Sequence, residues 1–577
     1  MRTVLASAAC FLLAGGAMAQ DDGSGTQNDA LYQNAVVAAD HPLASRAGVE
    51  MLRQGGNVVD AAVATAFALS VARPYSSGVG GGGFMVIWDA ERQQAIALDY
   101  RERAPRSAHR DMFVDPEDPG RALDELSRKG HLAVAVPGQV AGLCFALEKY
   151  GTLDLETVLQ PAIRMAREGV PIDEHDRTVQ AAVLKEFEEH PKYREQYAVL
   201  YEKYLNNGKP WRPGERFHSP QRKLLEAIAQ HGPEAFYRGP VADAIVAEMQ
   251  RGGGLITHRD LAEMAPVVRE PLRGDHDGLG LVTMPPPSSG GIALIETLHI
   301  LSAWEKLHPA DAIKPGDASR PEYLHLLTEA LKHAFADRAE FLGDADFATV
   351  PVERLTSRDY AEVLAGRIDA DRTKPLTAYG RFLPTEDAGT SHFSVMDRAG
   401  NAVACTETIN LLYGSFVVEP EYGIVFNNEM DDFAALPGQA NAFGLIQGEA
   451  NAVAPRKKPL SSMTPTIVVE EGKAVYALGG SGGPRIISGT VQVFLNLTEF
   501  DMSPADAVSH RRIHHQWVPN SLFVEDPLFG EVLGPMEKRG HDVKRRNELA
   551  AVQAVARTPR GLIGASDPRK GGAEAGY

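Results

Sequence analysis

Thr390 is the residue with the most distinctive potential chemistry, because a cut before it would make it an N-terminus. A polar, glycine-terminated stretch at 386–389 runs into a strand-like stretch at 391–395. Cleavage there would place a hydroxyl and a free α-amine on one residue, and an α-amine with a pKa near about 7.7 to 8.0 is partly neutral at working pH. The amine could take the hydroxyl proton and create a nucleophile. The local sequence equally fits a plainer interpretation, in which Gly389 and Thr390 only end a loop.

Ser481 is a second candidate nucleophile, since residues 479–483 match Gly-x-Ser-x-Gly in a strand-turn-helix context, as in the nucleophile elbow of α/β-hydrolases. Acids and histidines follow in the order that such a triad requires: Asp501 or Asp506, then His510, His514 or His515. All of them fall within the 35 residues from 481 to 515, which leaves no room for the strands that normally separate triad members. Alternatively, the glycines serve only as amide donors at the start of a helix.

Two predicted hairpins position these candidates. Extended stretches at 392–397 and 401–408 flank an Arg-Ala-Gly turn, so Thr390 and Thr408, equidistant from the turn centre, should face each other across the strands. The second hairpin covers 466–478 and leads through the glycine run into a helix predicted over 486–497.

The rest of the chain alternates between helical and extended patterns. Helices are predicted over 44–53 and 58–72, and strands over 84–88 and 95–98. Residues 121–345 are mainly helical in pattern, interrupted at 285–291 by a Pro-Pro-Pro-Ser-Ser-Gly-Gly run that predicts a fixed loop. Residues 366–389 are typical of a flexible connection, which suits a segment that is later cut.

Composition indicates a globular protein that acts on small molecules. The chain has 577 residues, 44% hydrophobic and 23% charged, and its net charge of −18 argues against a nucleic-acid or anionic-membrane partner. His514 and His515 lack further ligands at a metal-binding spacing, so a packing or surface role is favoured over a metal site.

The first nineteen residues resemble an export signal, with an apolar run too short to span a bilayer and an Ala-Met-Ala cleavage site. The mature chain is therefore expected to be periplasmic or secreted, without a membrane span. Only Cys144 and Cys405 then remain, and two buried thiols are the favoured interpretation over a disulfide.

Several ordered segments carry a resemblance that covers almost the whole mature length. They lie at 80–85, 99–105, 284–291, 389–392, 427–433, 459–463, 482–483 and 564–569. On these segments the chain resembles the γ-glutamyltranspeptidase (glutathione hydrolase) precursors. The resemblance implies an α+β fold, the four-layer αββα sandwich of the N-terminal nucleophile hydrolases, and a self-cleaved precursor. Here the parts would be a signal peptide (1–19), a large subunit (20–389) and a small catalytic subunit (390–577), the two subunits staying together as a heterodimer.

The resemblance also implies roles for individual residues. The catalytic set would be Thr390 as nucleophile, Thr408 as its orienting hydroxyl, and the amides of Gly482 and Gly483 as the oxyanion hole. The substrate's α-carboxylate would be bound by Arg101, Ser461 and Ser462, and its α-ammonium by Asn410, Glu429 and Asp432. Thr390 would take a γ-glutamyl group from glutathione or a related amide and pass it to water or to an amino acid or peptide amine, with no cofactor.

One position departs from the bacterial pattern. Residues 437–448 match a lid loop, but Phe443 stands where many members carry a tyrosine that bonds to the asparagine at position 410, which predicts looser closure and a larger share of hydrolysis. Three alternatives stay open: a related β-lactam acylase acting on glutaryl groups, the α/β-hydrolase centred on Ser481, and a secreted binding protein that neither cuts itself nor turns over substrate.

Overall fold

The structure is a computed structural model that describes residues 29–309, 316, 318–380, 390–439, 441–442, 444–445 and 447–577. The export signal predicted over 1–19 lies outside these residues. In the described part of the chain, no helix is both long and apolar enough to cross a membrane.

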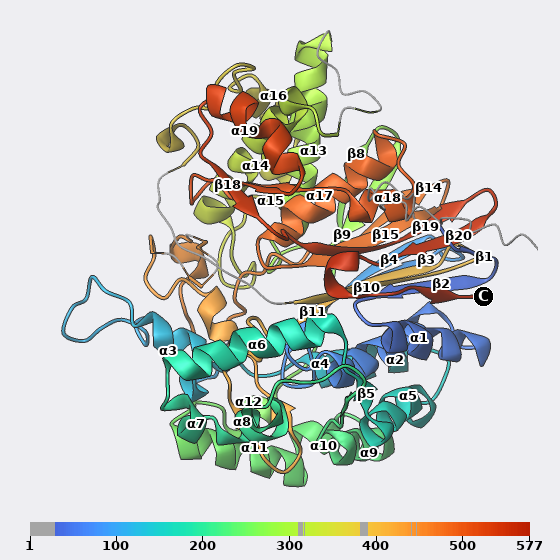
Figure 1. Ribbon diagram of the computed structural model, residues 1–577, viewed down its shortest axis with the longest axis vertical. Coiled ribbons are helices and arrows are strands. Elements are labelled where there is room, and N and C mark those ends of the chain that lie inside the picture. The colour runs from blue at the N-terminus through green and yellow to red at the C-terminus, as the bar shows by residue number, and fades with distance from the viewer. Residues whose placement is uncertain are drawn as a thin grey trace, which may run out of the picture.

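Two seven-stranded sheets stack face to face at the centre of the described chain (Figure 1). The first runs β21 (Ala575–Gly576), β2 (Ala35–Ala39), β10 (Ser391–Asp397), β11 (Ala402–Thr408), β3 (Gly82–Asp89), β4 (Gln94–Asp99), β7 (Val267–Arg269). The second runs β1 (Leu31–Tyr32), β20 (Gly561–Ala565), β19 (Ala551–Thr558), β15 (Lys473–Ser481), β14 (Thr466–Glu470), β9 (Leu279–Thr283), β8 (Leu272–His276). Apolar side chains of both sheets, among them Val36, Phe84, Ile467 and Val555, form one core.

Helices cover both outer faces of this pair of sheets (Figure 1). The first sheet is covered by α1 (Pro42–Arg53), α2 (Val58–Ala72) and α4 (Gln139–Tyr150), and α5 (Leu155–Glu168) packs on α2. The second sheet is covered by α13 (Gly290–Leu307) and α17 (Arg485–Thr498), and α14 (Pro321–Phe341) packs on α13. These layers confirm the predicted α+β class and the four-layer αββα order.

Further short elements surround the layers. The helices are α3 (Asp124–Arg128), α6 (Glu174–Glu189), α7 (Tyr193–Gln196), α8 (Ala198–Lys203), α9 (Arg222–His231), α10 (Glu234–Tyr237), α11 (Gly239–Gly252), α12 (His258–Ala262), α15 (Val352–Leu355), α16 (Arg358–Ala365), α18 (Pro504–Ser509) and α19 (Leu528–Lys538). Small sheets pair β5 (Val170–Pro171) with β6 (Arg216–Phe217), β12 (Val418–Glu419) with β13 (Ile424–Val425), and β16 (Ile513–His514) with β17 (Leu522–Glu525) and β18 (Val543–Arg546). The 3₁₀ turns include η5 (Glu429–Asp432) and η7 (Pro568–Lys570).

Helix α2 shows why an apolar stretch became a core helix. All of its residues are buried, as expected of a helix that is hydrophobic all round. Asn57 and Asp60 form a capping box at its start, in which each side chain accepts from the other residue's backbone amide. The helix packs on β10 and β11 and therefore supports the hairpin that carries Thr390 and Thr408.

The hairpin has the predicted register. Ser391 pairs with Glu407 and Met396 with Ala402, so the turn is centred on residue 399. β10 also pairs with β2, and β11 with β3, which places the hairpin inside its sheet rather than at an edge.

Three sequence predictions were wrong in part. Residues 121–345 include the strands β7, β8 and β9, and in β8 the charged residues Arg273 and Asp275 weaken the apolar pattern. The predicted loop at 285–291 ends earlier, because α13 already begins at Gly290. Residues 366–380 make defined contacts, since the Thr373 amide donates to the Arg539 carbonyl across 2.8 Å and the Trp517 indole to the Leu376 carbonyl across 3.1 Å. The rest of that connection, 381–389, lies outside the described residues.

Candidate active site

Two threonine hydroxyls meet where the β10–β11 hairpin ends. Thr390 immediately precedes β10, is only 5% exposed, and its Oγ1 lies 3.3 Å from Oγ1 of Thr408, the last residue of β11. The Thr408 Oγ1 also accepts the backbone amide of Asn410 across 2.8 Å. The predicted juxtaposition of Thr390 and Thr408 is therefore confirmed.

Lys570 holds the backbone of Thr390 from the other side. Its ammonium donates to the Thr390 carbonyl and to Asp40 Oδ2, 2.7 Å away, and all three residues are buried. Sequence reasoning missed Lys570. The only signal was its position just after the closing segment at 564–569 that carried the resemblance.

Charged side chains gather beside the hydroxyls. Arg101 follows β4, and its guanidinium donates to Glu429 and to Asp432, the first and last residues of η5, while Glu102 lies 3.7 Å away. Burial raises the pKa of the Glu429 carboxyl well above its ordinary value, against the opposing charge of Arg101. The side chains predicted to bind opposite ends of a substrate are thus paired with one another in this structure.

Asn410 adopts a left-handed backbone conformation with φ of 74°, which asparagine tolerates better than most residues. Its side-chain amide donates to the Asn428 carbonyl across 3.0 Å. The left-handed conformation of Asn410 and its bond to Asn428, which immediately precedes η5, direct the chain from Thr408 toward η5.

Gly482 and Gly483 form the turn between β15 and α17, with φ of +127° and +57° that favour glycine. Gly483 lines the same small pocket as all the other predicted site residues except Gly482. The pocket is lined by Arg101, Thr390, Thr408, Asn410, Glu429, Asp432, Leu445, Ser461, Ser462, Met463, Gly483, Pro484 and Ile486.

Ser481 does not meet a triad among the described residues. Its hydroxyl contacts the Ala551 carbonyl at 3.5 Å, whereas His514 bonds to Ser488 across 2.7 Å and His510 to Ser319 across 3.3 Å. His515 accepts the Trp517 amide across 3.0 Å. His514 and His515 are buried and pack, as predicted, and the elbow interpretation is left without its base.

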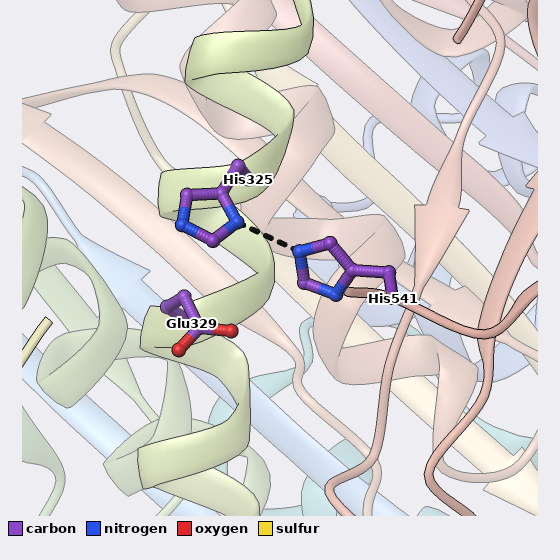
Figure 2. Close-up of side chains that lie close together, drawn as sticks. All are labelled: His325, Glu329 and His541. Carbon is purple, nitrogen blue, oxygen red and sulfur yellow. Dashed lines mark hydrogen bonds between the residues drawn. The ribbon is translucent and has the colours of Figure 1, made fainter. Parts of the chain in front are cut away.

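His325, Glu329 and His541 form a buried cluster of possible metal ligands (Figure 2), and none of the three lines this pocket. His325 Nδ1 and His541 Nε2 are 2.7 Å apart, and Glu329 lies one helical turn from His325 on α14. Glu329 already accepts from the Lys332 ammonium across 2.9 Å, and also from Thr373 and Tyr379. Lys332 therefore supplies the positive charge that a metal ion would otherwise bring.

The two cysteines of the described chain are free and buried, as predicted. Phe443 lies outside the described residues, so its lid role stays a prediction. Sequence reasoning also missed Arg338 in α14, because nothing in the helical pattern distinguishes it from a solvent-facing arginine.

A family model and two related proteins match the chain over most of its length, and all three matches point to the same family. The family model described as Gamma-glutamyltranspeptidase matches residues 44–577. The chain is 41% identical to the glutathione hydrolase proenzyme of Escherichia coli, covering 98% of this chain and 96% of the relative, and 39% identical to that of Pseudomonas aeruginosa, covering 94% of each.

Two solved structures agree. Cephalosporin acylase from Bacillus halodurans superposes with a TM-score of 0.83 at 26% identity, covering 98% of this chain and 99% of that one. The γ-glutamyltranspeptidase of Helicobacter pylori gives 0.53 at 36% identity, covering 62% of this chain and 96% of that one.

Proposed function

The chain belongs to the γ-glutamyltranspeptidase family, and from that premise we propose that Thr390 is the residue through which it acts. It is an enzyme that cleaves and transfers γ-glutamyl groups, with glutathione hydrolase and γ-glutamyltransferase activity. It is made as a proenzyme and works as a processed heterodimer. The observation that supports Thr390 is its hydroxyl, 3.3 Å from that of Thr408 in a pocket that also holds Arg101, Glu429 and Asp432.

Processing comes first in this mechanism. The Thr390 hydroxyl attacks the Gly389 carbonyl, the Thr390 amide nitrogen leaves and takes the proton, and water then hydrolyses the resulting ester. The products are a carboxylate on Gly389 and a free α-amine on Thr390, so that residues 20–389 and 390–577 become the two subunits.

Catalysis then reuses the same hydroxyl. The α-amine takes the Oγ1 proton as Oγ1 attacks the γ-carbonyl of the substrate. The Gly482 and Gly483 amides stabilise the negative oxygen of the tetrahedral intermediate, and losing one such donor costs about 10²- to 10³-fold in rate. The amine product leaves with the proton, and water or an acceptor amine releases the γ-glutamyl group from Thr390.

Substrate binding would exchange ion pairs that already exist. The α-carboxylate of a substrate could accept two hydrogen bonds from the Arg101 guanidinium and further hydrogen bonds from the hydroxyls of Ser461 and Ser462. The α-ammonium of a substrate could form ion pairs with Glu429 and Asp432 and a hydrogen bond with the Asn410 side chain. We propose glutathione and related γ-glutamyl compounds as donors and amino acids or peptides as acceptors. Export by residues 1–19 to the periplasm or the medium fits a substrate found outside the cytoplasm.

A glutaryl acylase is the second candidate, favoured by the TM-score of 0.83 with a cephalosporin acylase. A glutaryl group lacks the α-ammonium, so it would leave Glu429 and Asp432 without a cationic ligand. Rates on γ-glutamyl and glutaryl p-nitroanilides separate the two, and we expect the γ-glutamyl compound to be preferred.

The decisive experiment is an intact mass of the purified mature protein beside Thr390→Ala. We expect two polypeptides for the wild type, the smaller beginning at Thr390, and one inactive chain for the variant. Ser481→Ala is the matched control and should be cut and active. Normal processing of Thr390→Ala, or an uncut wild type, would overturn the proposal.

A further inference from the structure

Arg338, near the end of α14, is buried beside the proposed carboxylate subsite without lining the pocket. It is 1% exposed, and its Nε donates to Ser289 Oγ across 2.9 Å while Nη2 donates to Ser462 Oγ across 3.3 Å. Its third nitrogen, Nη1, has no hydrogen-bond partner among the described residues. A buried, unsatisfied charged donor is unfavourable and calls for an explanation.

The charges around the pocket are distributed unevenly. Arg101 has three carboxylates within reach, Glu102, Glu429 and Asp432. Arg338 forms no ion pair with any described residue. Burial lowers the pKa of its guanidinium to about 10, with Asp432 opposing and Arg101 reinforcing that shift. Beside the pocket, Arg338 is therefore a positively charged side chain without an ion-pair partner among the described residues.

Hydrogen-bond direction fixes what Arg338 does to Ser462. A guanidinium only donates, so the Ser462 oxygen accepts from it and keeps its own hydrogen for another acceptor. Ser462 lines the pocket, whereas Arg338 lies behind it. Its hydroxyl hydrogen thus stays available to an acceptor in the pocket, such as the carboxylate of a substrate.

Arg338 also anchors the second serine through the proline-rich loop. Ser289 accepts from Arg338 and donates to the Ser461 carbonyl across 2.6 Å, and its amide donates to the same carbonyl across 2.8 Å. Ser461 in turn donates its amide to Pro287 across 2.9 Å. The run at 285–291 thereby joins α14 to the Ser461–Ser462 segment.

We infer that Arg338 is a positioning residue for the α-carboxylate of the substrate, because it orients the Ser462 hydroxyl toward that carboxylate. It also supplies a positive charge near the carboxylate, whereas the charge of Arg101 is already balanced by three acids. This inference rests on the proposed function. It assigns a role to the proline-rich loop, which holds Ser289 between Arg338 and Ser461.

Three anilides isolate the carboxylate. The γ-glutamyl anilide carries carboxylate and ammonium, the glutaryl anilide only the carboxylate, and the 4-aminobutanoyl anilide only the ammonium. For Arg338→Gln and the milder Arg338→Lys we expect kcat/KM to fall about 10- to 100-fold on the first two, mainly through KM, because hydrogen bonds to charged groups contribute about 1.5 to 3 kcal/mol. On the third, the ratio to wild type should stay near one.

Controls separate this role from a structural one. Arg358→Gln, on the exposed face of α16, should behave as wild type on all three substrates. The loss for Ser462→Ala combined with Arg338→Gln should be smaller than the product of the two single losses, because part of the effect of Arg338 passes through Ser462. Equal losses on all three anilides, an additive double variant, or two Arg338 variants that fail to fold and process would overturn the inference. A wild type inactive on the γ-glutamyl anilide would instead refute the proposed function.

Discussion

A threonine hydroxyl needs a base, and Thr408 and Lys570, two of the groups that contact Thr390 in this structure, are suited to holding it rather than to taking its proton. Thr408 offers another hydroxyl, and Lys570 donates to both Asp40 and the Thr390 carbonyl, as a protonated amine does. Both fix the residue's position. We assign the role of base to the α-amine that cleavage would expose, so that the proposed catalyst forms only after processing.

The residues that sequence reasoning found and those that it missed differ in physical kind. Thr390 stood out through its own glycine-terminated segment, whereas Arg101 and Ser462 were found because they lie in segments that resemble the family. Arg338 and Lys570 act through contacts between parts of the chain that are far apart in sequence. Arg338 and Ser462 are 124 residues apart, and Lys570 and Thr390 are 180 residues apart. Nothing in the local pattern distinguishes a buried arginine or lysine from an exposed one, although most are exposed.

Phe443 carries a prediction at this scale. A phenylalanine can cover the pocket but cannot donate to Asn410, so we expect Phe443→Tyr to raise the ratio of transpeptidation to hydrolysis. The ratio is measured from the products of γ-glutamyl p-nitroanilide with and without glycylglycine. An unchanged ratio would show that the hydroxyl has no part in lid closure, and Phe347→Tyr, at an exposed position, is the control.

At the scale of elements, helices and hairpins were predictable where their pattern was strong. The α2 helix and the β10–β11 register matched prediction because an all-apolar run and a short turn each leave few alternatives. Strand β8 was missed because, at the edge of its sheet, it keeps exposed charged residues that weaken the alternation. Edge strands commonly carry such charges.

The contact between α13 and α14 contains a buried acid pair that predicts a pH dependence. Burial raises the pKa of Glu296 well above its ordinary value, with the nearby Asp337 reinforcing the shift, and neither Glu296 oxygen has a donor partner among the described residues. The folded state therefore binds more protons than the unfolded chain. The free energy of unfolding should fall as pH rises above about 4.3, until the folded pKa is passed.

Glu296→Gln keeps the shape and removes the titration. Relative to wild type, we expect the variant to gain stability as pH rises from about 5 to about 8, because only the wild-type protein carries a carboxyl whose pKa is raised on folding. Urea unfolding across this pH range measures the difference. Glu353→Gln on α15 is the exposed control, and parallel pH curves for Glu296→Gln and wild type would contradict the raised pKa of Glu296.

For the whole molecule, both proposed subunits contribute strands to both sheets. In the first sheet β10 and β11 come from the smaller piece and lie between β2 and β3 of the larger one, and in the second β9 of the larger piece pairs with β14 of the smaller. After a cut at 389–390 neither piece keeps a complete sheet. Sheet and core would have to unfold before the pieces could part.

This interleaving predicts how the processed protein behaves. The two polypeptides should co-elute as one species on size exclusion, unfold in one transition, and separate only in denaturant. Uncut Thr390→Ala should elute at the same volume and unfold at a similar urea concentration. Two species from the wild type in native buffer would contradict the interleaved arrangement.

The place of β10 between β2 and β11 has a consequence for backbone entropy. A chain terminus is ordinarily among the most mobile parts of a protein. Here the new terminus would begin one residue before a central strand that is bonded on both sides, with a buried lysine holding its first carbonyl. The ordering of the nucleophile would then be completed when the precursor folds, so substrate binding need not immobilise it again, and the amides of β10 should be among the slowest in the molecule to exchange with solvent hydrogen.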